Sequence, residues 1–264
     1  MNRPRLEGKI AVVTGVASGM GKAIAEMFAE EGAGVVGCDF NADDGARTIE
    51  GIVKSGGEGV FVPCNLRRRE DIVSVREKAI ERFGRVTTLV NAAGIVVLST
   101  FMEQSDADMM SLFETNYRGA VWMMREFLPY LVESGKSSIT NIASISVYQP
   151  ESFAYYYGSF KAAIAMLTKN LAREYSRQGV RLNVICPGPC DTGMTPESCR
   201  MDSGNEEAVK RLVDSVLCGR VGSGKDIAYC ATYLASDEAE WVTASQFTID
   251  GGASFAGGDH FVPE

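Results

Sequence analysis

The sequence predicts an α/β fold in which a doubly wound parallel sheet of about seven strands carries helices on both faces. Short runs rich in β-branched residues alternate with longer segments of helical period along the whole chain. This alternation implies right-handed crossovers between strands that lie parallel in one sheet. Because no compositional break or low-complexity linker interrupts the 264 residues, we expect residues 1–264 to form a single domain.

The strands are predicted from seven short apolar runs. These runs are KIAVVT (9–14), GVVGCD (34–39), GVFVPC (59–64), TTLVN (87–91), SSITNIAS (137–144), VRLNVIC (180–186) and SQFTID (245–250). Between the first two runs, apolar side chains recur on one face of a helix, as packing against a sheet requires. The residues of this face are Met20, Ala23, Ile24, Met27 and Phe28.

Two longer helices are predicted at roughly 106–133 and 153–178. Both are rich in Met, Leu and aromatic residues over more of their circumference than one sheet-facing stripe needs. The surplus indicates either a subunit interface or helices that lie deep inside the monomer. We favour the interface and therefore expect a homo-oligomer, either a dimer or a tetramer.

The charge of the chain narrows the class of partner. A formal net charge of -8 and a pI near 4.9 argue against nucleic acid or an anionic membrane surface as the partner, which leaves a small-molecule substrate. The one dense basic run, Arg67 to Arg69, is either a binding patch or, as we favour, a solvated loop before a helix.

The cysteines and the single histidine limit the kinds of catalytic and metal site that the chain could form. The seven cysteines are scattered and include no C-x-x-C pair, which favours a reducing cytoplasmic location over a disulfide framework or a zinc site. The N-terminus resembles neither a signal peptide nor a membrane span. Because His260 is the sole histidine, we expect neither a histidine base nor a bound metal.

A glycine-rich turn follows the first predicted strand. The sequence TGVASGMG (14–21) has glycines at 15, 19 and 21, which permit a tight turn and let backbone N–H groups, including those of Ser18 and Met20, approach a pyrophosphate at the start of a helix. The spacing alone is weak, but its place between a strand and a helix is that of a dinucleotide site in a Rossmann-type domain. The second strand ends in an acid, Asp39, 18 residues after Gly21.

Asp39 decides the expected cofactor. A carboxylate at this place can accept hydrogen bonds from both adenosine ribose hydroxyls, whereas it would repel a 2′-phosphate. Neither Phe40 nor Ser18 supplies the positive charge that such a phosphate needs. We therefore expect NAD rather than NADP; the alternative is that Asp39 only caps the next helix or turn.

Seven ordered motifs over nearly the whole chain resemble the short-chain dehydrogenase/reductase family. They are TGVASGMG, LVNAAG (89–94), ETNYRG with Asn116, NIASIS with Ser144, Tyr157 followed by Lys161, CPGPCDT (186–192) and FTIDGG (247–252). The resemblance implies an oxidoreductase that transfers a hydride between a nicotinamide cofactor and a secondary alcohol or ketone.

Tyr157 is the expected general acid/base. Of the tyrosines at 155, 156 and 157, only Tyr157 has a lysine four residues later, which a helix brings to the same face. We expect the Lys161 ammonium to favour the phenolate and so lower the pKa of Tyr157. The resemblance implies that Lys161 also holds the nicotinamide ribose.

Two further polar residues complete the implied tetrad. Ser144 resembles the serine that binds the substrate oxygen, and Ser146 competes for that role two residues later. Asn116 resembles the asparagine that reaches the lysine through a water; it could equally make a side chain-to-backbone bond that bends its helix.

The remaining motifs imply further cofactor contacts. Asn91, Ala92 and Gly94 resemble the floor of the cofactor site, and Pro187, Gly188, Cys190 and Thr192 resemble the loop that grips the nicotinamide carboxamide. Asn65, followed by Leu66, stands where relatives usually carry Asp; its amide can still bind the adenine. Turn chemistry alone is the alternative for these loops.

The substrate side is less clearly encoded. Residues 193–220 form the expected lid, with Met194 against the substrate, and Tyr148, Phe153 and Tyr155 would add to an apolar cleft with few charges. Aromatic residues also replace small ones near the site, including Phe160 before Lys161. We therefore favour a hydroxysteroid or bile acid dehydrogenase that works in the oxidative direction.

Other functions stay open at this point. Within the family, a 3-oxoacyl reductase or a polyol dehydrogenase is the alternative, and outside enzymes a non-catalytic nucleotide-binding scaffold. The glycine-rich tail, residues 252–264, could dock on a neighbouring subunit or fray.

Overall fold

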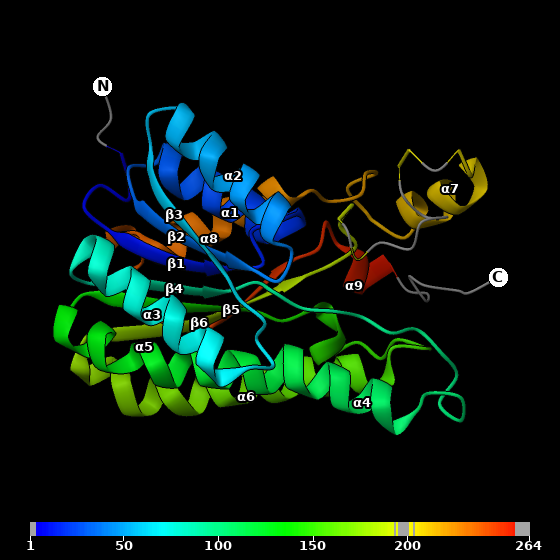
Figure 1. The fold of residues 1–264 in the computed structure, drawn as a ribbon. Helices are drawn as coiled ribbons and strands as arrows, with labels where there is room; N and C mark the ends of the chain where they lie inside the picture. Colours follow the sequence, from blue (N-terminus) through cyan, green and yellow to red (C-terminus); the bar gives the residue numbers. More distant parts are fainter. Residues whose placement is uncertain (1–3, 193, 195–200, 203, 257–264) are drawn as a thin grey trace.

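The computed structural model describes residues 4–192, 194, 201–202 and 204–256, and all seven predicted strands lie within this part. The strands are β1 (Ile10–Thr14), β2 (Gly34–Asp39), β3 (Glu58–Pro63), β4 (Thr88–Asn91), β5 (Ser137–Ile142), β6 (Val180–Pro187) and β7 (Gln246–Ile249). They pair in parallel in the order β3-β2-β1-β4-β5-β6-β7 (Figure 1). The predicted doubly wound parallel sheet is confirmed.

The strand order reverses between β1 and β4. From β1 the chain builds outward through β2 to β3, and from β4 it builds in the opposite direction through β5 and β6 to β7. The connections that follow β1 and β4 run toward opposite edges of the sheet. A crevice therefore opens between them at the carboxyl ends of these two strands. The glycine turn that follows Thr14 and the loop that follows Asn91 both begin there.

Helices cover both faces of the sheet (Figure 1). One face carries α1 (Gly19–Glu30), α2 (Ala42–Lys54) and α8 (Gly224–Ala235), and the other carries α3 (Arg69–Phe83), α5 (Ala120–Ser134) and α6 (Tyr155–Tyr175). Each face has its own apolar core: Phe28 and Ile24 pack toward α8 on the first, and Phe127 and Leu131 pack toward α3 on the second. The alternating strand and helix pattern therefore folds into three layers, as expected.

A π-helical segment interrupts the first of the two long helices. Ser105 and Asp108 form a capping box at the start of α4 (Asp106–Leu112), and Gly135, with a φ of 69°, ends α5. Between these two helices, Phe113–Gly119 widens into a π-helix. The predicted extent of 106–133 is thus confirmed, whereas the wide turn in its middle was not predicted. The second long helix, α6 with its short 3₁₀ extension to Gln178, matches the predicted 153–178.

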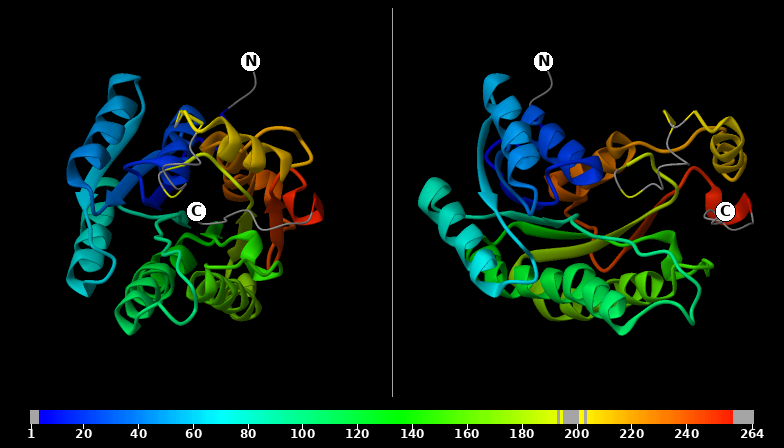
Figure 2. Two further views of the ribbon diagram at one scale, coloured as in Figure 1. Left: turned by 90° about the vertical axis from the view of Figure 1, so that its right-hand side faces the viewer. Right: turned by 45° about the vertical axis from the view of Figure 1, so that its right-hand side comes forward.

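Two small helices lie beyond one end of the sheet (Figure 2). They are α7 (Glu206–Asp214), within the predicted lid, and α9 (Ala253–Ala256), at the start of the predicted tail. Val216 after α7 and Ala253 in α9 pack on Ile145, which follows the carboxyl end of β5. The other parts of these predictions, at 193, 195–200, 203 and 257–264, lie outside the described residues. Within the described part, no helix combines the length and apolarity needed to cross a bilayer.

Candidate active site

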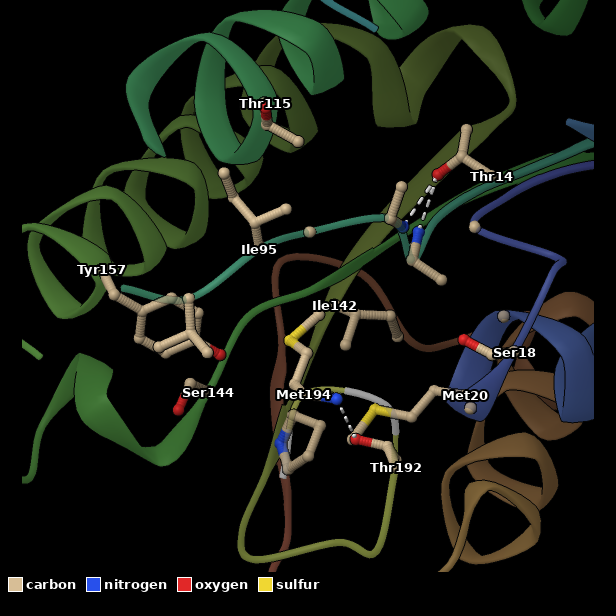
Figure 3. A pocket seen from close by; sticks show the side chains of 18 of the residues that line it. Thr14, Ser18, Met20, Ile95, Thr115, Ile142, Ser144, Tyr157, Thr192 and Met194 are labelled. Carbon is tan, nitrogen blue, oxygen red and sulfur yellow. Dashed lines mark hydrogen bonds between the residues drawn. The ribbon is translucent and has the colours of Figure 1, made fainter. Parts of the chain in front are cut away.

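A cavity of about 860 Å³ extends from the glycine turn to Tyr157 at the carboxyl ends of the central strands. Figure 3 shows Thr14 and Ser18 at one side of this cavity, and Ser144 and Tyr157 at the other. Most of the predicted site residues line it. They are Gly15, Ser18, Gly19, Met20, Gly21, Asp39, Phe40, Asn65, Leu66, Ala92, Gly94, Ser144, Tyr157, Lys161, Pro187, Gly188, Cys190, Thr192 and Met194.

The glycine turn is built by close backbone approach. Gly15 has a φ of 80°, and a Cβ there would lie 2.8 Å from the Cα of Ala93. A Cβ at Gly21 would collide with the carbonyl group of Gly15. Only glycine therefore lets α1 start directly beneath the end of β1.

Thr14 joins the two chain segments of the crevice. Its Oγ1 accepts hydrogen bonds from the backbone N–H groups of Ala92 and Ala93, both at 3.0 Å, as drawn in Figure 3. This role of Thr14 was not predicted from the sequence. Its position, last in β1 and directly before the turn, is the signal that could have identified it, because its side chain can there reach the start of the loop after β4.

The start of α1 is open to an anion. Its N-cap residue Ser18 makes no side-chain cap hydrogen bond, and the first turn carries no acidic residue. The first backbone N–H groups of an α-helix lack intrahelical partners and lie at the positive end of the helix dipole. A phosphate is thus a fitting ligand for this end of the cavity.

Asp39 presents its carboxylate at the end of β2. One carboxylate oxygen accepts from the N–H of Ala17 at 2.9 Å, and the other accepts from the N–H of Asn41 at 2.8 Å. A carboxylate offers about four lone-pair sites, so each oxygen can still accept a ribose hydroxyl. The N-cap of α2 is Asn41, whose Oδ1 accepts from the N–H of Asp44. Asp39 therefore orders the turn before α2 but does not cap that helix.

The arginine run, Arg67 to Arg69, lies beside the cofactor end of the cavity. Arg67 lines the cavity, and its guanidinium donates to Thr115 Oγ1 at 2.9 Å and to Ser111 Oγ at 2.5 Å. Arg68 and Arg69 form ion pairs with Glu70 and Glu126. The run is thus a loop before α3 whose side chains are bound within the chain, as favoured, except that Arg67 also borders the cofactor end.

Tyr157 and Lys161 meet one turn apart on α6. The Lys161 Nζ lies 5.6 Å from the centre of the Tyr157 ring and donates a hydrogen bond of 2.8 Å to the carbonyl oxygen of Ile142, at the end of β5. Tyr157 forms a side-chain hydrogen bond with Ser144. Tyr155 and Tyr156 lie against Phe101 instead. The choice of Tyr157 among the three tyrosines is therefore consistent with the geometry.

Burial dominates the electrostatics of this pair. It raises the pKa of Tyr157, the carboxylate of Glu151 raises it further, and the hydrogen bond from Ser144 acts in the opposite direction. Burial also lowers the pKa of Lys161 to about 8. The direction is thus opposite to the expected fall in the pKa of Tyr157, because loss of solvation disfavours the phenolate.

Ser144 rather than Ser146 faces the cavity. The chain is extended at Ser144, with a φ of -166°, and then turns into a 3₁₀-helix over Ile145–Val147. Their hydroxyl oxygens lie 2.8 Å apart, and the N–H of Ser146 donates to Ser144 Oγ. Ser146 consequently stands behind Ser144 and orients its hydroxyl.

Asn116 does not line the cavity but braces it from the π-helical segment. Its Oδ1 accepts from the N–H of Ile95, and its Nδ2 donates to the carbonyl oxygen of Ile95, both at 2.8 Å. A Cβ at Gly94 would lie 3.2 Å from this Oδ1 and 3.5 Å from the Lys161 Nζ. Asn116 thus lies close to the lysine, and its side chain bonds another segment's backbone instead of bending its own helix.

Several other predicted residues lie away from the cavity. Asn91 donates to Asn141 Oδ1 at 2.7 Å within the sheet, and the Tyr148 hydroxyl bonds Thr248 in β7. Phe160 packs on Phe113 between helices. None of these residues, nor Phe153, is among the described residues that line the cavity, so the aromatic side chains expected there do not form its described walls. The signal at Phe160 was misread because a residue directly before Lys161 points to another side of α6.

The substrate side of the cavity is aliphatic, with one acid. Its apolar walls come from the loop after β4, the turn after β5 and the start of the lid. These residues are Ile95, Val96, Leu98, Ile145 and Met194. Glu151 also lines the cavity, and sequence reasoning missed it. Its position six residues before Tyr157 is the only sequence signal that could have suggested it.

The residues around the cavity fit a nicotinamide dinucleotide. The open N-terminus of α1 suits a pyrophosphate, Asp39 offers acceptors for ribose hydroxyls, and Lys161 and Tyr157 lie at the other end of the same cavity. The glycines leave room for the backbone to approach the ligand closely.

Known proteins share this arrangement over their full length. A family model described as enoyl-(acyl carrier protein) reductase matches residues 15–254. The chain is 35% identical over 250 residues to the 2,5-dichloro-2,5-cyclohexadiene-1,4-diol dehydrogenase LinX of Sphingobium indicum, which covers 95% of this chain and 98% of the relative. It is 33% identical over 258 residues to 3beta-hydroxysteroid dehydrogenase 1 of Eggerthella lenta, which covers 97% of each. The solved 3-ketoacyl-(acyl-carrier-protein) reductase from Brucella melitensis, complexed with NADH, has a TM-score of 0.86 at 28% identity and covers 95% of this chain and 100% of that chain.

Proposed function

The chain belongs to the short-chain dehydrogenase/reductase family, and on that premise we propose that it is an NAD-dependent dehydrogenase of a secondary alcohol borne on an apolar ring skeleton. As a member of this family it is an oxidoreductase that acts on the CH–OH group and uses a nicotinamide cofactor. The observation that carries the proposal is one continuous cavity, with Asp39 at one end and Ser144, Tyr157 and aliphatic walls at the other.

Tyr157 and Ser144 have different roles at the substrate oxygen. When bound, the cofactor accepts or donates a hydride at C4 of its nicotinamide ring. Tyr157 takes the hydroxyl proton during oxidation and returns it during reduction, while Ser144 holds the same oxygen. Hydrogen bonds from both side chains strengthen as negative charge develops on that oxygen. Ile142 fixes Lys161 beside Tyr157 through its carbonyl oxygen.

The preference for NAD rests on Asp39. Its carboxylate would face a 2′-phosphate with like charge, and neighbouring Phe40 is 78% exposed and supplies no cation. Arg67 lines the same cavity, but its guanidinium is bound by Thr115 and Ser111. These contacts favour the unphosphorylated ribose.

A hydroxysteroid or bile acid is the substrate class we favour. The aliphatic walls around Ser144 and Tyr157 suit a saturated ring skeleton, since burying apolar surface contributes about 25 cal/mol per Å². The similarity to a 3beta-hydroxysteroid dehydrogenase supports this class. A 3-oxoacyl reductase is the second candidate, supported by the similarity to the NADH-bound 3-ketoacyl reductase.

The proposal extends to assembly and location. We expect α4 and α6 to pair across a two-fold axis in a homo-oligomer, because Met110 and Met166 expose apolar surface on them. Light scattering that gave a monomer at micromolar concentration would contradict this assembly. The buried thiols of Cys38 and Cys64, which are free and hydrogen-bonded to each other, favour a reducing compartment such as the cytoplasm.

The deciding experiment is the rate of nicotinamide reduction by the purified protein. NAD and NADP are each tested with hydroxysteroids and bile acids that differ in hydroxyl position, and then with polyols. The reverse rate, oxidation of NADH or NADPH, is measured with 3-oxosteroids and 3-oxoacyl substrates. The Tyr157→Phe variant should lose about 10²–10⁴-fold in rate while still binding NAD. Tyr156→Phe, next in sequence but packed on Phe101, should keep the wild-type rate.

The outcomes separate the candidates. Turnover of a steroid hydroxyl with NAD that Tyr157→Phe abolishes would support the proposal. Turnover of 3-oxoacyl substrates alone would favour the second candidate. Cofactor binding without turnover of any alcohol or ketone would contradict the proposed dehydrogenase activity and favour a non-catalytic nucleotide-binding scaffold.

A further inference from the structure

Glu151 is the acidic side chain on the substrate side of the cavity, and its role rests on the proposed function. Among the described residues that line the cavity, the other acids are Asp39 and Asp44, at the adenosine end. Glu151 instead follows the Ser144 turn and precedes Tyr157. A carboxylate placed there acts on the substrate rather than on the dinucleotide.

The segment that carries Glu151 is fixed on both sides. Before it, the N–H groups of Tyr148 and Gln149 donate to the carbonyl oxygen of Ile145 at 3.1 and 2.9 Å. After it, the carbonyl oxygen of Phe153 accepts from the N–H of Ser99 at 3.1 Å. Phe153 has a φ of 67°, which costs a bulky residue on the order of 1–3 kcal/mol. Backbone strain of this kind persists where the surrounding structure holds it, and it gathers at ligand sites.

The carboxylate of Glu151 affects the pKa of Tyr157. Its carboxylate is the second largest cause, after burial, of the raised pKa of Tyr157. The other charged or titratable groups that face Tyr157 are Lys161 on α6, Cys186 on β6 and Cys190 in the loop after β6. Glu151 and Tyr157 also line the same cavity, so a substrate held at Tyr157 occupies space that Glu151 borders.

The surroundings decide what Glu151 can bind. The neighbouring walls are aliphatic, from Ile95, Val96, Leu98, Ile145 and Met194. An ionised carboxylate is acceptor-only and has about four lone-pair sites, so the interaction that Glu151 already makes within the chain leaves capacity for a hydroxyl donor. A hydrogen bond to a charged group contributes about 1.5–3 kcal/mol, more than a neutral one. A carboxylate on the substrate would instead meet like charge.

We propose that Glu151 is a specificity-determining residue that accepts a hydrogen bond from a second hydroxyl of the substrate. The preferred substrate is then an alicyclic diol with no negative charge at the end that reaches Glu151. One hydroxyl reacts at Ser144 and Tyr157, the apolar ring lies on the aliphatic walls, and the other hydroxyl reaches Glu151.

The test compares four ring compounds that differ at one position. Cyclohexanol, cyclohexane-1,4-diol, 4-hydroxycyclohexanecarboxylate and 4-aminocyclohexanol are measured with NAD, as substrates by kcat/KM and as competitive inhibitors against the best hydroxysteroid of the first experiment. The proteins are the wild type, Glu151→Gln, which keeps one neutral acceptor, and Glu151→Met, which keeps none. Glu103→Gln is the control, since Glu103 bonds Thr100 outside the cavity.

The expected pattern is specific to the second hydroxyl. The wild type should prefer the diol over cyclohexanol by about 10-fold, as a charged hydrogen bond implies. Glu151→Gln should lose most of this preference and Glu151→Met all of it, with cyclohexanol changed less than about 3-fold. Glu151→Gln should also accept the carboxylate about 10-fold better, whereas Glu103→Gln should match the wild type.

A pH profile supplies a readout that a purely structural role would not move. A nearby carboxylate disfavours the phenolate, so removing its charge lowers the pKa of Tyr157. The rise of kcat/KM with pH during oxidation should therefore shift to lower pH in Glu151→Gln. It should stay in place in Glu103→Gln.

Two outcomes overturn this inference while the proposed function stands. The first is oxidation of ring alcohols with a diol preference that is the same in the wild type and both Glu151 variants. The second is a wild-type preference for 4-aminocyclohexanol over the diol, which would assign the carboxylate to a cation. If the wild type binds NAD but oxidises no alcohol, the proposed function fails, and the inference fails with it.

Discussion

The two ends of the cavity differ in how function relates to stability. At the cofactor end, the features that suit a dinucleotide also hold the fold together: Gly21 lets α1 pack under the turn, and Thr14 joins the loops after β1 and β4. At the catalytic end, the features needed for chemistry oppose folding. Lys161 is only 3% exposed, and burial lowers its pKa, while Phe153 holds a left-handed backbone conformation. Substitutions should therefore have opposite consequences for stability at the two ends.

The largest effect is expected at Gly21. In Gly21→Ala, the added Cβ would lie 2.8 Å from the carbonyl oxygen of Thr14 and still closer to Gly15, both parts of the backbone that cannot easily move. We expect a loss of about 4 kcal/mol in the free energy of unfolding, toward the upper end for overpacking, together with loss of NAD binding. Chemical denaturation and NAD titration measure the two quantities.

The matched control is another helical glycine. A Cβ at Gly51, inside α2, meets nothing within 4 Å. Gly51→Ala should therefore stabilise the protein by about 0.5–1 kcal/mol through helix propensity, without changing NAD affinity. If Gly21→Ala folded as stably as the wild type and lost only NAD binding, function and folding would not be coupled at the cofactor end.

Asp39 should give the next largest effect. Asp39→Asn removes the charge that opposes a 2′-phosphate and leaves only one oxygen for the two backbone donors, Ala17 and Asn41. We expect the kcat/KM ratio of NADP to NAD to rise about 30-fold to 100-fold, about 2–3 kcal/mol. Stability should fall by about 1 kcal/mol.

Steady-state rates with both cofactors, beside denaturation curves, measure this prediction. Asp44→Asn, on the first turn of α2 and bordering the same cavity, is the matched control. An unchanged cofactor ratio in Asp39→Asn would show that the cofactor end does not select its ligand through this carboxylate.

The same contrast explains what the sequence could predict. The seven strands and the glycine turn were predicted because short apolar runs and close backbone approach leave few alternatives. The pairing of Tyr157 with Lys161 was predicted because a four-residue spacing on a helix fixes the relation of two side chains whatever surrounds them. Local geometry was sufficient in each case.

The substrate side could not be predicted in the same way. Tyr148 and Phe160 are aromatic and near Tyr157 in sequence, yet both contact residues distant in sequence. The Tyr148 hydroxyl bonds Thr248, and the Phe160 ring packs on Phe113. Glu151 lines the cavity from a segment in which the carbonyl oxygen of Phe153 accepts a hydrogen bond from Ser99, in another loop. Such placements depend on tertiary contacts between loops, which no local pattern reports. The net pKa of Tyr157 was misjudged for the same reason, since its burial comes from the assembled site.

Replacing Lys161 tests whether a residue at the catalytic end lowers the stability of the fold. Below about pH 8 the lysine is charged in both the folded and the unfolded protein, so the cost of burying that charge is fully present. The fall of the pKa from 10.5 to about 8 corresponds to about 3 kcal/mol. Loss of the hydrogen bond to Ile142 offsets about 1 kcal/mol of this. Lys161→Met should therefore be inactive, yet about 2 kcal/mol more stable than the wild type at pH 7.

The pH dependence gives this last prediction its sign. Between about pH 8 and 10.5 the unfolded wild type still binds a proton that the native protein has released, so wild-type stability rises with pH through this window relative to the variant. Denaturation curves at pH 7 and pH 9.5 should show the advantage of Lys161→Met shrinking. Lys169→Met, at a half-buried lysine further along the same helix, is the matched control. If Lys161→Met were less stable than the wild type at pH 7, the catalytic end would resemble the cofactor end, and this lysine would serve folding as well as chemistry.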